Sequence, residues 1–220
     1  MRSKIQKTPS SIVIALAKGR ILKAALPLLK ASGITPLENP ADTRKLFLET
    51  NVQHLKLLVI RATDVPTFVE YGGADIGITG KDVLLEHTGT DYYEPLDLKI
   101  AECRLALAVP VDRPLPDGPL VVATKYPKTA RTYFDSIGRQ AEIIKLHGSM
   151  ELAPLVGMSD CIVDLIDTGE TLKANGLLVL ETICDISSRL IINKAASKTK
   201  REVLLNVMSS IRQGVCGPDA

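Results

Sequence analysis

The stretch Glu151–Leu172, ELAPLVGMSDCIVDLIDTGETL, decides the fold and the position of the candidate site. Its apolar run Cys161–Ile166 predicts a buried strand, and the glycine-containing turn that follows leads into a helix. Asp164 interrupts the apolar run near the carboxyl end of the strand, where open α/β sheets bind their ligands. The sequence therefore predicts a strand-to-helix turn with polar side chains at a ligand site.

The turn itself has the composition of a phosphate site. It offers threonine hydroxyls, a glycine and the N–H groups at the start of a helix. With carboxylates beside it, the turn predicts a ligand that carries vicinal hydroxyls and a phosphate, such as a ribose 5-phosphate. The alternative stays open on this stretch alone: Asp164 caps a helix or a turn, and Gly169 only relieves strain. The candidate binding residues are Asp164, Asp167, Thr168, Gly169, Glu170 and Thr171.

The composition is that of a globular chain with a substantial core. Of the 220 residues, 45% are hydrophobic, enough for one large domain or two small ones. No apolar run approaches the roughly 20 residues that cross a bilayer. The first residues, MRSKIQKTPSS, are basic but lack the apolar segment of a secretory signal. We therefore expect a cytoplasmic protein that does not associate with membranes.

The charge balance and the pattern of histidines and cysteines argue against a nucleic-acid-binding protein and against a metalloprotein. The 27 basic and 25 acidic residues are spread along the chain and leave a net charge of +2, which gives no indication of nucleic-acid binding. The three histidines and four cysteines show no ligand spacing, so we expect reduced thiols and no metal held by protein side chains. Any anionic ligand must therefore be met by local arginines.

Short strands and helices alternate along the chain, which predicts a largely parallel α/β architecture. The last helix, at 198–213, is expected to bury one side. The buried side would carry Val203, Leu204, Val207, Met208 and Ile211. The predicted strands lie at 12–16, 45–49, 55–60, 74–78, 105–109, 120–123, 143–146, 161–166, 177–180 and 190–192.

Three strand-to-helix turns in the first hundred residues carry further candidates. Lys18 and Arg20 follow the first strand, and Thr79 follows the strand at 74–78. Asp64 is a predicted N-cap, with Pro66 early in the helix that it would begin. The carboxyl ends of parallel strands meet at one edge of a sheet, so we expect these turns to face the same end. Ordinary capping and solvation remain the alternative for each residue.

The blocks ALAKGRI, RATDVP, GADIGITGKD, ATKYP and SSRLIIN occur in this order along the chain. They look like the blocks of the short-form ATP phosphoribosyltransferases, the family that begins histidine biosynthesis, and the chain resembles that family over nearly its whole length. Within the opening stretch, the family's signature is matched by Glu151, Gly157, Ser159, Ile162, Asp164, Leu165, Thr168, Gly169, Thr171 and Leu172.

The resemblance implies a two-domain fold like that of type II periplasmic binding proteins, with the active site in the interdomain cleft. Domain I would comprise residues 1–102 and 187–220, and domain II, residues 103–186, would bind phosphoribosyl pyrophosphate. The family's long form adds a C-terminal domain that binds histidine, so a chain ending at Ala220 implies the short form. We expect a homodimer that assembles with a regulatory subunit resembling histidyl-tRNA synthetase.

The implied reaction joins N1 of the ATP adenine to C1 of phosphoribosyl pyrophosphate and releases pyrophosphate, with Mg²⁺ carried by the substrates. The main chain and hydroxyls of residues 168–171 would hold the 5-phosphate, with the Glu170 side chain turned outward. Asp164 would hold the ribose hydroxyls, with Asp167 in support. These roles come from the resemblance together with the chemistry of the turn.

The same resemblance assigns cations to the departing pyrophosphate. Arg20 is the leading candidate, and Arg44 from the loop ENPADTR is the second, acting within one chain or across a dimer interface. The planar guanidinium, which is always charged, suits this task better than lysine. Lys18, Asp64 and Thr79 are weaker candidates for the nucleotide and its metal.

Two other functions compete with this interpretation. The implied fold is shared with solute receptors, which would make the chain a small-molecule binder or sensor. Another phosphoribosyltransferase that uses a different base would need the same turn, since only the flanking blocks select ATP. Turnover with ATP would distinguish an enzyme from a small-molecule binder. Replacing ATP by other nucleobases in the same assay would distinguish an ATP phosphoribosyltransferase from one that uses a different base.

Overall fold

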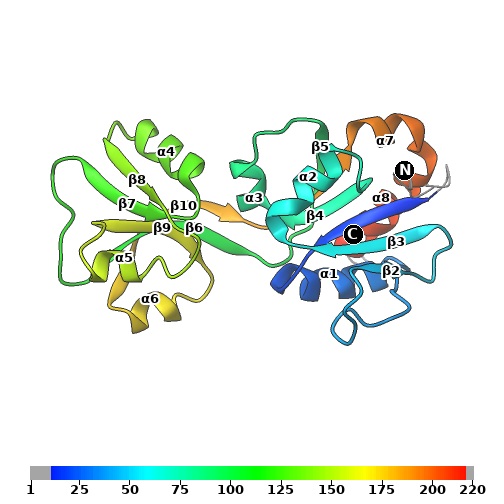
Figure 1. Cartoon of the computed structure of the whole chain (residues 1–220), viewed down its shortest axis with the longest axis horizontal. Coiled ribbons are helices and arrows are strands. Elements are labelled where there is room, and N and C mark those ends of the chain that lie inside the picture. The colour runs from blue at the N-terminus through cyan, green and yellow to red at the C-terminus, as the bar shows by residue number, and fades with distance from the viewer. Residues whose placement is uncertain (1–10, 217–220) are drawn as a thin grey trace, which may run out of the picture. The chain divides into compact units, whose positions relative to one another are not determined.

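The computed structural model describes residues 11–216, which divide into two compact units (Figure 1). Unit 1 contains the residues up to Ala101 together with those from Ser187 onward, and unit 2 is Glu102–Ile186. The bounds differ from the predicted domains at Glu102 alone. The chain thus leaves unit 1, forms unit 2 without interruption, and returns to complete unit 1.

Unit 1 is built on a six-stranded sheet of order β2-β3-β1-β4-β11-β5. Strand β1 is parallel to β3 and β4, whereas β2, β5 and β11 run antiparallel to their neighbours. The predicted largely parallel architecture is therefore wrong for half of this sheet. The strands are β1 (Ile12–Ala17), β2 (Phe47–Glu49), β3 (Leu55–Ile60), β4 (Ile76–Gly80), β5 (Tyr92–Asp97) and β11 (Ser188–Asn193).

Helices cover both faces of this sheet. On one face, α1 (Arg20–Ala31), α7 (Lys194–Thr199) and α8 (Arg201–Cys216) pack over the largest apolar core. On the other face lie α2 (Val65–Glu70) and α3 (Lys81–Glu86).

The last helix buries a narrower side than the sequence predicted. Its buried residues are Leu204, Val207 and Ile211, whereas Val203 is 42% exposed. One residue corresponds to about 100° around a helix, so Val203 lies beside the buried stripe and not within it. The predicted burial of Val203 is therefore wrong.

A buried ion pair ties three parts of unit 1 together. The Asp75 carboxylate accepts the N–H of Val13 at 2.9 Å and lies 2.9 Å from Nζ of Lys200. The Lys200 ammonium also donates to the carbonyl of Ser11 at 2.6 Å. The Asp75 side chain is buried and the Lys200 side chain is only 13% exposed, so these contacts offset hydration that both charges lose. The contact joins the start of β1, the approach to β4 and the residue between α7 and α8.

Unit 2 has a five-stranded sheet of order β10-β6-β9-β7-β8. Strand β7 is parallel to β8 and β9, and β6 is antiparallel to β9 and β10, so this sheet is mixed as well. Strand β9, the apolar run of the opening stretch, is at the centre. The strands are β6 (Cys103–Pro110), β7 (Leu120–Thr124), β8 (Ala141–Lys145), β9 (Cys161–Ile166) and β10 (Leu177–Ile186).

Small side chains bring two short helices of unit 2 close to its sheet. The helices α5 (Leu152–Leu155) and α6 (Glu170–Ala174) pack over a core in which four residues are alanines. Alanine side chains are small, so they let the helices lie close to the sheet. The alanines are Ala106, Ala108, Ala123 and Ala153. A third helix, α4 (Pro127–Ser136), packs along β8.

Candidate active site

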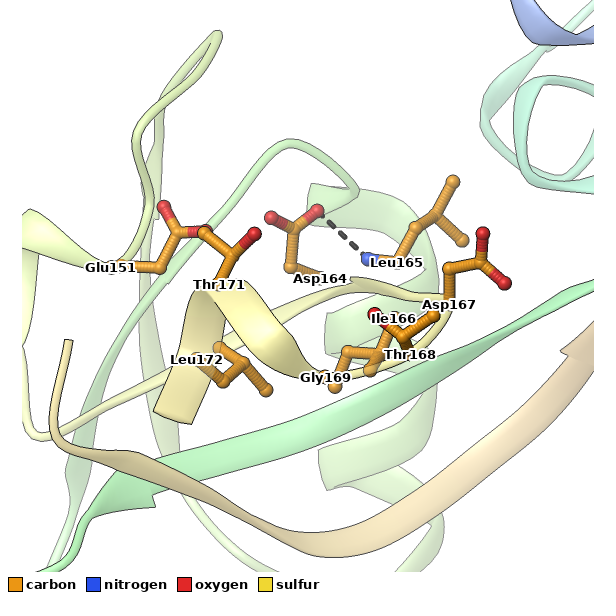
Figure 2. A pocket seen from close by; sticks show the side chains of 9 residues that line it. All are labelled: Glu151, Asp164, Leu165, Ile166, Asp167, Thr168, Gly169, Thr171 and Leu172. Carbon is orange, nitrogen blue, oxygen red and sulfur yellow. Dashed lines mark hydrogen bonds between the residues drawn. The ribbon is translucent and has the colours of Figure 1, made fainter. Parts of the chain in front are cut away.

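A pocket of about 170 Å³ opens at the carboxyl end of β9 in unit 2 (Figure 2). It is formed by the end of β9, the loop to α6, the start of α6 and the residue that precedes α5. The lining residues are Glu151, Asp164, Leu165, Ile166, Asp167, Thr168, Gly169, Thr171 and Leu172. The structure thus brings together five of the six residues predicted for the ribose 5-phosphate. The sixth, Glu170, has an exposed side chain, as expected for a group turned outward.

Asp164 is the polar centre of the pocket. It is half-buried, and the N–H of Leu165 donates to its Oδ1 at 2.8 Å (Figure 2). Burial raises the pKa of Asp164 to about 6, the Leu165 N–H opposes that rise, Glu151 adds to it and Lys125 opposes it. A carboxylate held in a poorly hydrated place is ready to accept hydrogen bonds from sugar hydroxyls, which would replace the lost water.

The loop between β9 and α6 has the backbone of an anion site. Gly169 has φ 81°, the left-handed conformation that glycine adopts with least strain. The Thr168 hydroxyl accepts the Glu170 N–H at 3.4 Å, and α6 begins at that residue. The first N–H groups of a helix lack intrahelical acceptors, so they attract anions. The loop therefore combines hydroxyls with main-chain donors beside the Asp164 carboxylate.

Two residues near Asp164 received no role from the sequence. Glu151 appeared only as part of a signature. Its carboxylate nevertheless points into the same pocket as the Asp164 carboxylate and the Thr171 hydroxyl (Figure 2). Lys125 follows β7 directly, and β7 pairs with β9. The sequence did show that Lys125 is a charged residue directly after a predicted strand. Its relation to Asp164 could be inferred only once β7 was known to pair with β9.

The candidates of unit 1 lie at one edge of its sheet. Ala17 is paired with Ile60 and Leu16 with Ile78, so the carboxyl ends of β1, β3 and β4 lie together. The antiparallel strand β2 starts at this edge, since the Val59 N–H donates to the carbonyl of Leu46 at 2.7 Å. The exposed candidates at this edge are Lys18, Arg20, Arg44 and Asp64.

Two details of this edge differ from the prediction. Asp64 occupies the predicted N-cap position of α2, but its side chain makes no capping hydrogen bond. A 3-10 turn, η1 (Ala62–Asp64), precedes α2, and Pro66 removes one N–H that would need a cap. Thr79 lies inside β4 and not in the turn after it. Its side chain is fully buried, and its hydroxyl donates to the carbonyl of Ala62 at 3.1 Å.

The described part of the chain holds no cluster suited to a resident metal ion. Among residues 11–216, no group of three or more His, Cys, Asp or Glu side chains could hold one. The cysteines Cys103, Cys161 and Cys184 carry free thiols.

The fold defines the class of protein architecture. The chain has the architecture of type II periplasmic binding proteins, with a pocket lined by carboxylates and hydroxyls in unit 2. The aliphatic sulphonate binding protein SsuA from Escherichia coli matches with a TM-score of 0.61 over 95% of this chain and 74% of that chain. At 14% identity, this likeness concerns the fold alone.

Comparison with sequence relatives identifies the protein family and not only the fold. Residues 61–213 match the family HisG, described as ATP phosphoribosyltransferase. The ATP phosphoribosyltransferase of Halorhodospira halophila is 59% identical over 88% of this chain and 91% of its own length. The ATP phosphoribosyl transferase (HisG:HisZ) complex from Thermotoga maritima matches with a TM-score of 0.80 and 34% identity, over 93% of this chain and 98% of that chain. The chain belongs to the HisG family of ATP phosphoribosyltransferases.

Proposed function

We propose that this chain catalyses the first step of histidine biosynthesis, in which N1 of ATP attacks C1 of phosphoribosyl pyrophosphate. The products are N1-(5-phosphoribosyl)-ATP and pyrophosphate. Family membership supports the reaction. The proposed binding site for the sugar rests on one observation, the pocket after β9. In that pocket a half-buried carboxylate lies beside a glycine-containing loop at the start of a helix.

The chemistry of this reaction is dominated by charge. N1 of adenine already has a lone pair, so no base is needed to activate it. The departing pyrophosphate gains negative charge while the ribose ring becomes cationic. Two polyphosphates must also be held in one site. Catalysis should therefore come from positioning and from electrostatic stabilisation of the developing charges.

Unit 2 supplies the groups that hold the ribose 5-phosphate. In this proposal the hydroxyls of Thr168 and Thr171 and the main chain from Gly169 onward bind the 5-phosphate. Asp164 accepts hydrogen bonds from the two ribose hydroxyls, with Asp167 in support. The exposed Glu170 side chain is directed away from the phosphate, which it would repel.

Unit 1 supplies the cations. Arg20 is the first residue of α1 and is exposed, so its guanidinium can reach a bound anion. Arg44 is exposed in the loop before β2, at the same edge of the sheet. We assign Arg20 and Arg44 to the departing pyrophosphate, and Lys18 and Asp64 to the nucleotide and its metal. Thr79 was a weaker candidate, and its buried hydroxyl supports a structural role better than contact with ATP.

Magnesium enters this proposal with the substrates. Mg²⁺ prefers oxygen ligands, keeps several waters and is commonly bound through substrate phosphates. It would lower the negative charge of the pyrophosphate before and during its departure. The carboxylates near the polyphosphates, such as Asp64, would meet the ion through its water ligands.

The proposed assembly is a homodimer that joins a regulatory subunit resembling histidyl-tRNA synthetase. The Thermotoga maritima relative, which is a HisG:HisZ complex, supports a partner of this kind. We place the assembly in the cytoplasm, where its substrates are made. Among residues 11–216, no helix is long and apolar enough to cross a bilayer.

A turnover assay tests the reaction directly. The protein, mixed with ATP, phosphoribosyl pyrophosphate and Mg²⁺, should raise the ultraviolet absorbance as N1 of adenine is alkylated, with release of one pyrophosphate per product. Omission of phosphoribosyl pyrophosphate is the control. Saturable binding without turnover would support a receptor, and faster turnover with another base would support a different phosphoribosyltransferase.

Mixed dimers test the place of Arg44. If Arg44 serves the partner's site, then mixing inactive Arg20→Ala and Arg44→Ala chains gives dimers with one intact site. Such a mixture should recover about a quarter of wild-type activity, because half of its dimers are mixed. No recovery would place Arg44 in its own chain's site, and a fully active monomer would exclude both the dimer and the shared site.

A further inference from the structure

The strand register places Lys125 beside Asp164. Strands β7 and β9 are paired from Val122 with Cys161 to Thr124 with Val163. Directly beyond this pairing, Lys125 follows Thr124 at the end of β7 and Asp164 follows Val163, and the Lys125 charge acts on the Asp164 carboxyl. On the opposite side, β6 offers Ala106 as the partner of Asp164. The central strand therefore places this carboxylate between a lysine and an alanine.

A second carboxylate completes this environment. Glu151, directly before α5, lines the same pocket, and its side chain points toward the space that Asp164 faces (Figure 2). Among the residues that the structure describes, the charged side chains that act on Asp164 are Lys125 and Glu151. In this described part of the chain, the adjoining elements carry four other charged residues. Arg104 on β6 pairs with Ile166, two residues beyond Asp164 on β9. The other three, Asp167, Glu170 and Lys173, are exposed to solvent.

These two neighbours oppose each other. A carboxylate accepts hydrogen bonds through both oxygens only when it is ionised, because a protonated acid converts one of them to a donor. Burial and Glu151 both disfavour the ionised form of Asp164, whereas Lys125 favours it. Lys125 also reduces the negative charge that a polyanionic substrate meets as it enters the pocket.

We propose that Lys125 and Glu151 are positioning residues that set the ionisation of Asp164, and with it the pH range in which the pocket binds the ribose hydroxyls of the substrate. The inference rests on the proposed function, in which Asp164 binds those hydroxyls. It adds that the ribose is recognised by a balanced group of three charges, contributed by β9, the end of β7 and the start of α5.

Opposite shifts of a pH profile test the inference. The measurement is kcat/KM for phosphoribosyl pyrophosphate against pH at saturating ATP, in which the wild type should lose activity below about pH 6 as Asp164 is protonated. Lys125→Met should move this acid limb upward by on the order of one pH unit, and Glu151→Gln should move it downward. Lys125→Arg keeps the charge and should leave the limb in place. Lys128→Met, three residues further in α4, is the matched control and should also leave it unchanged.

The outcomes separate this inference from the proposed function. A wild-type protein without turnover would contradict the proposed function itself. An active wild type whose acid limb is unmoved in both variants, or moves the same way in both, would overturn the inference. So would a loss that is equal at every pH, since that is the mark of structural damage. If Lys125→Met does not fold, the other two variants still test the inference. It then requires a downward shift of the acid limb in Glu151→Gln and an unshifted limb in Lys125→Arg.

Discussion

A glycine turn with positive φ leads into a helix in each of the two units, and the two turns present opposite chemistry. Gly19 after β1 has φ 86° and ψ −133°, whereas Gly169 after β9 has φ 81° and ψ 4°, so the two turns share the sign of φ but not the whole backbone conformation. The turn of unit 1 is flanked by the exposed cations Lys18 and Arg20 and opens a helix of twelve residues. The turn of unit 2 is surrounded by acids and hydroxyls that line a pocket, and its helix has five residues.

The difference shows how a glycine turn before a helix can serve two tasks. A pocket with fixed donors and a half-buried carboxylate suits the groups whose charge stays the same throughout the reaction, namely the 5-phosphate and the ribose hydroxyls. Exposed guanidinium groups, one at the start of a longer helix and one in a loop, suit a charge that grows during the reaction. Changes in unit 2 should therefore weaken binding, and changes in unit 1 should slow the chemical step.

Arg20→Ala should show the largest effect. If the guanidinium stabilises the departing pyrophosphate, the chemical step should fall by on the order of a hundredfold or more, about 3 kcal/mol. Single-turnover measurements give that rate. Lys23→Ala, an exposed cation one turn further along α1, is the matched control. Unchanged single-turnover chemistry with only weaker substrate binding would remove the contrast between the two turns.

Asp164→Asn should act on one substrate alone. Hydrogen bonds to a charged acceptor are worth about 1.5–3 kcal/mol, so affinity for phosphoribosyl pyrophosphate should fall by roughly tenfold to a hundredfold. Affinity for ATP should stay the same in calorimetric titrations. Equal weakening of both substrates would favour a structural role for this carboxylate.

The same substitution should make the folded protein more stable at neutral pH. Because the pKa of Asp164 is raised to about 6 on folding, its charge destabilises the folded state above that pH. Removing the charge should increase the free energy of unfolding by about 1–3 kcal/mol at pH 7. The gain should shrink as pH falls from 6 toward 4, because the wild-type carboxyl becomes protonated in the folded state while it stays largely ionised in the unfolded chain. Urea unfolding at pH 7.5 and at pH 4.5 measures it, and a gain that grows on acidification would contradict this account.

Gly169→Ala should give a smaller change. A Cβ at this position has room, since the nearest atom is Cγ2 of Ile166 at 3.8 Å, so the cost is the left-handed backbone alone. That conformation costs an alanine about 1–2 kcal/mol. Affinity for phosphoribosyl pyrophosphate should drop by up to about tenfold as the loop relaxes. Gly19→Ala, at φ 86° and ψ −133°, imposes more backbone strain and should instead lower kcat.

Thr79→Val should have the smallest effect on function. Loss of its hydrogen bond to the carbonyl of Ala62 should cost about 1 kcal/mol of stability. The KM for ATP should be unchanged in steady-state assays. A KM that rises severalfold while stability is kept would restore Thr79 to the nucleotide site.

Local patterns made much of unit 2 and its pocket predictable. The run Cys161–Ile166 is apolar and short, and the turn after it carries its own chemistry, so both were visible in one stretch. Glu151 and Lys125 were not, because their nearness to Asp164 depends on the packing of α5 and on the pairing of β7 with β9.

The edge strands were hardest to predict. Strand β5 contains Pro95 and exposed side chains, which an edge strand tolerates but a sequence pattern does not suggest. Strand β10 extends to Ile186, well beyond the predicted 177–180, through polar residues and two register shifts against β6. The direction of such strands depends on where the chain re-enters a sheet, so the mixed pairing could not be inferred from strand-and-helix alternation.

The interrupted course of unit 1 has a consequence for synthesis on the ribosome. Strand β11 lies between β4 and β5, and Ser187 donates to Asp97, which precedes it by 90 residues. Until β11 emerges, both older strands have an open edge, and Asp75 has no ammonium partner. The contiguous segment of unit 2 is complete before then. The unit that comes second along the chain can thus finish folding first, and loss of the last thirty or so residues would leave unit 1 without its central closing strand.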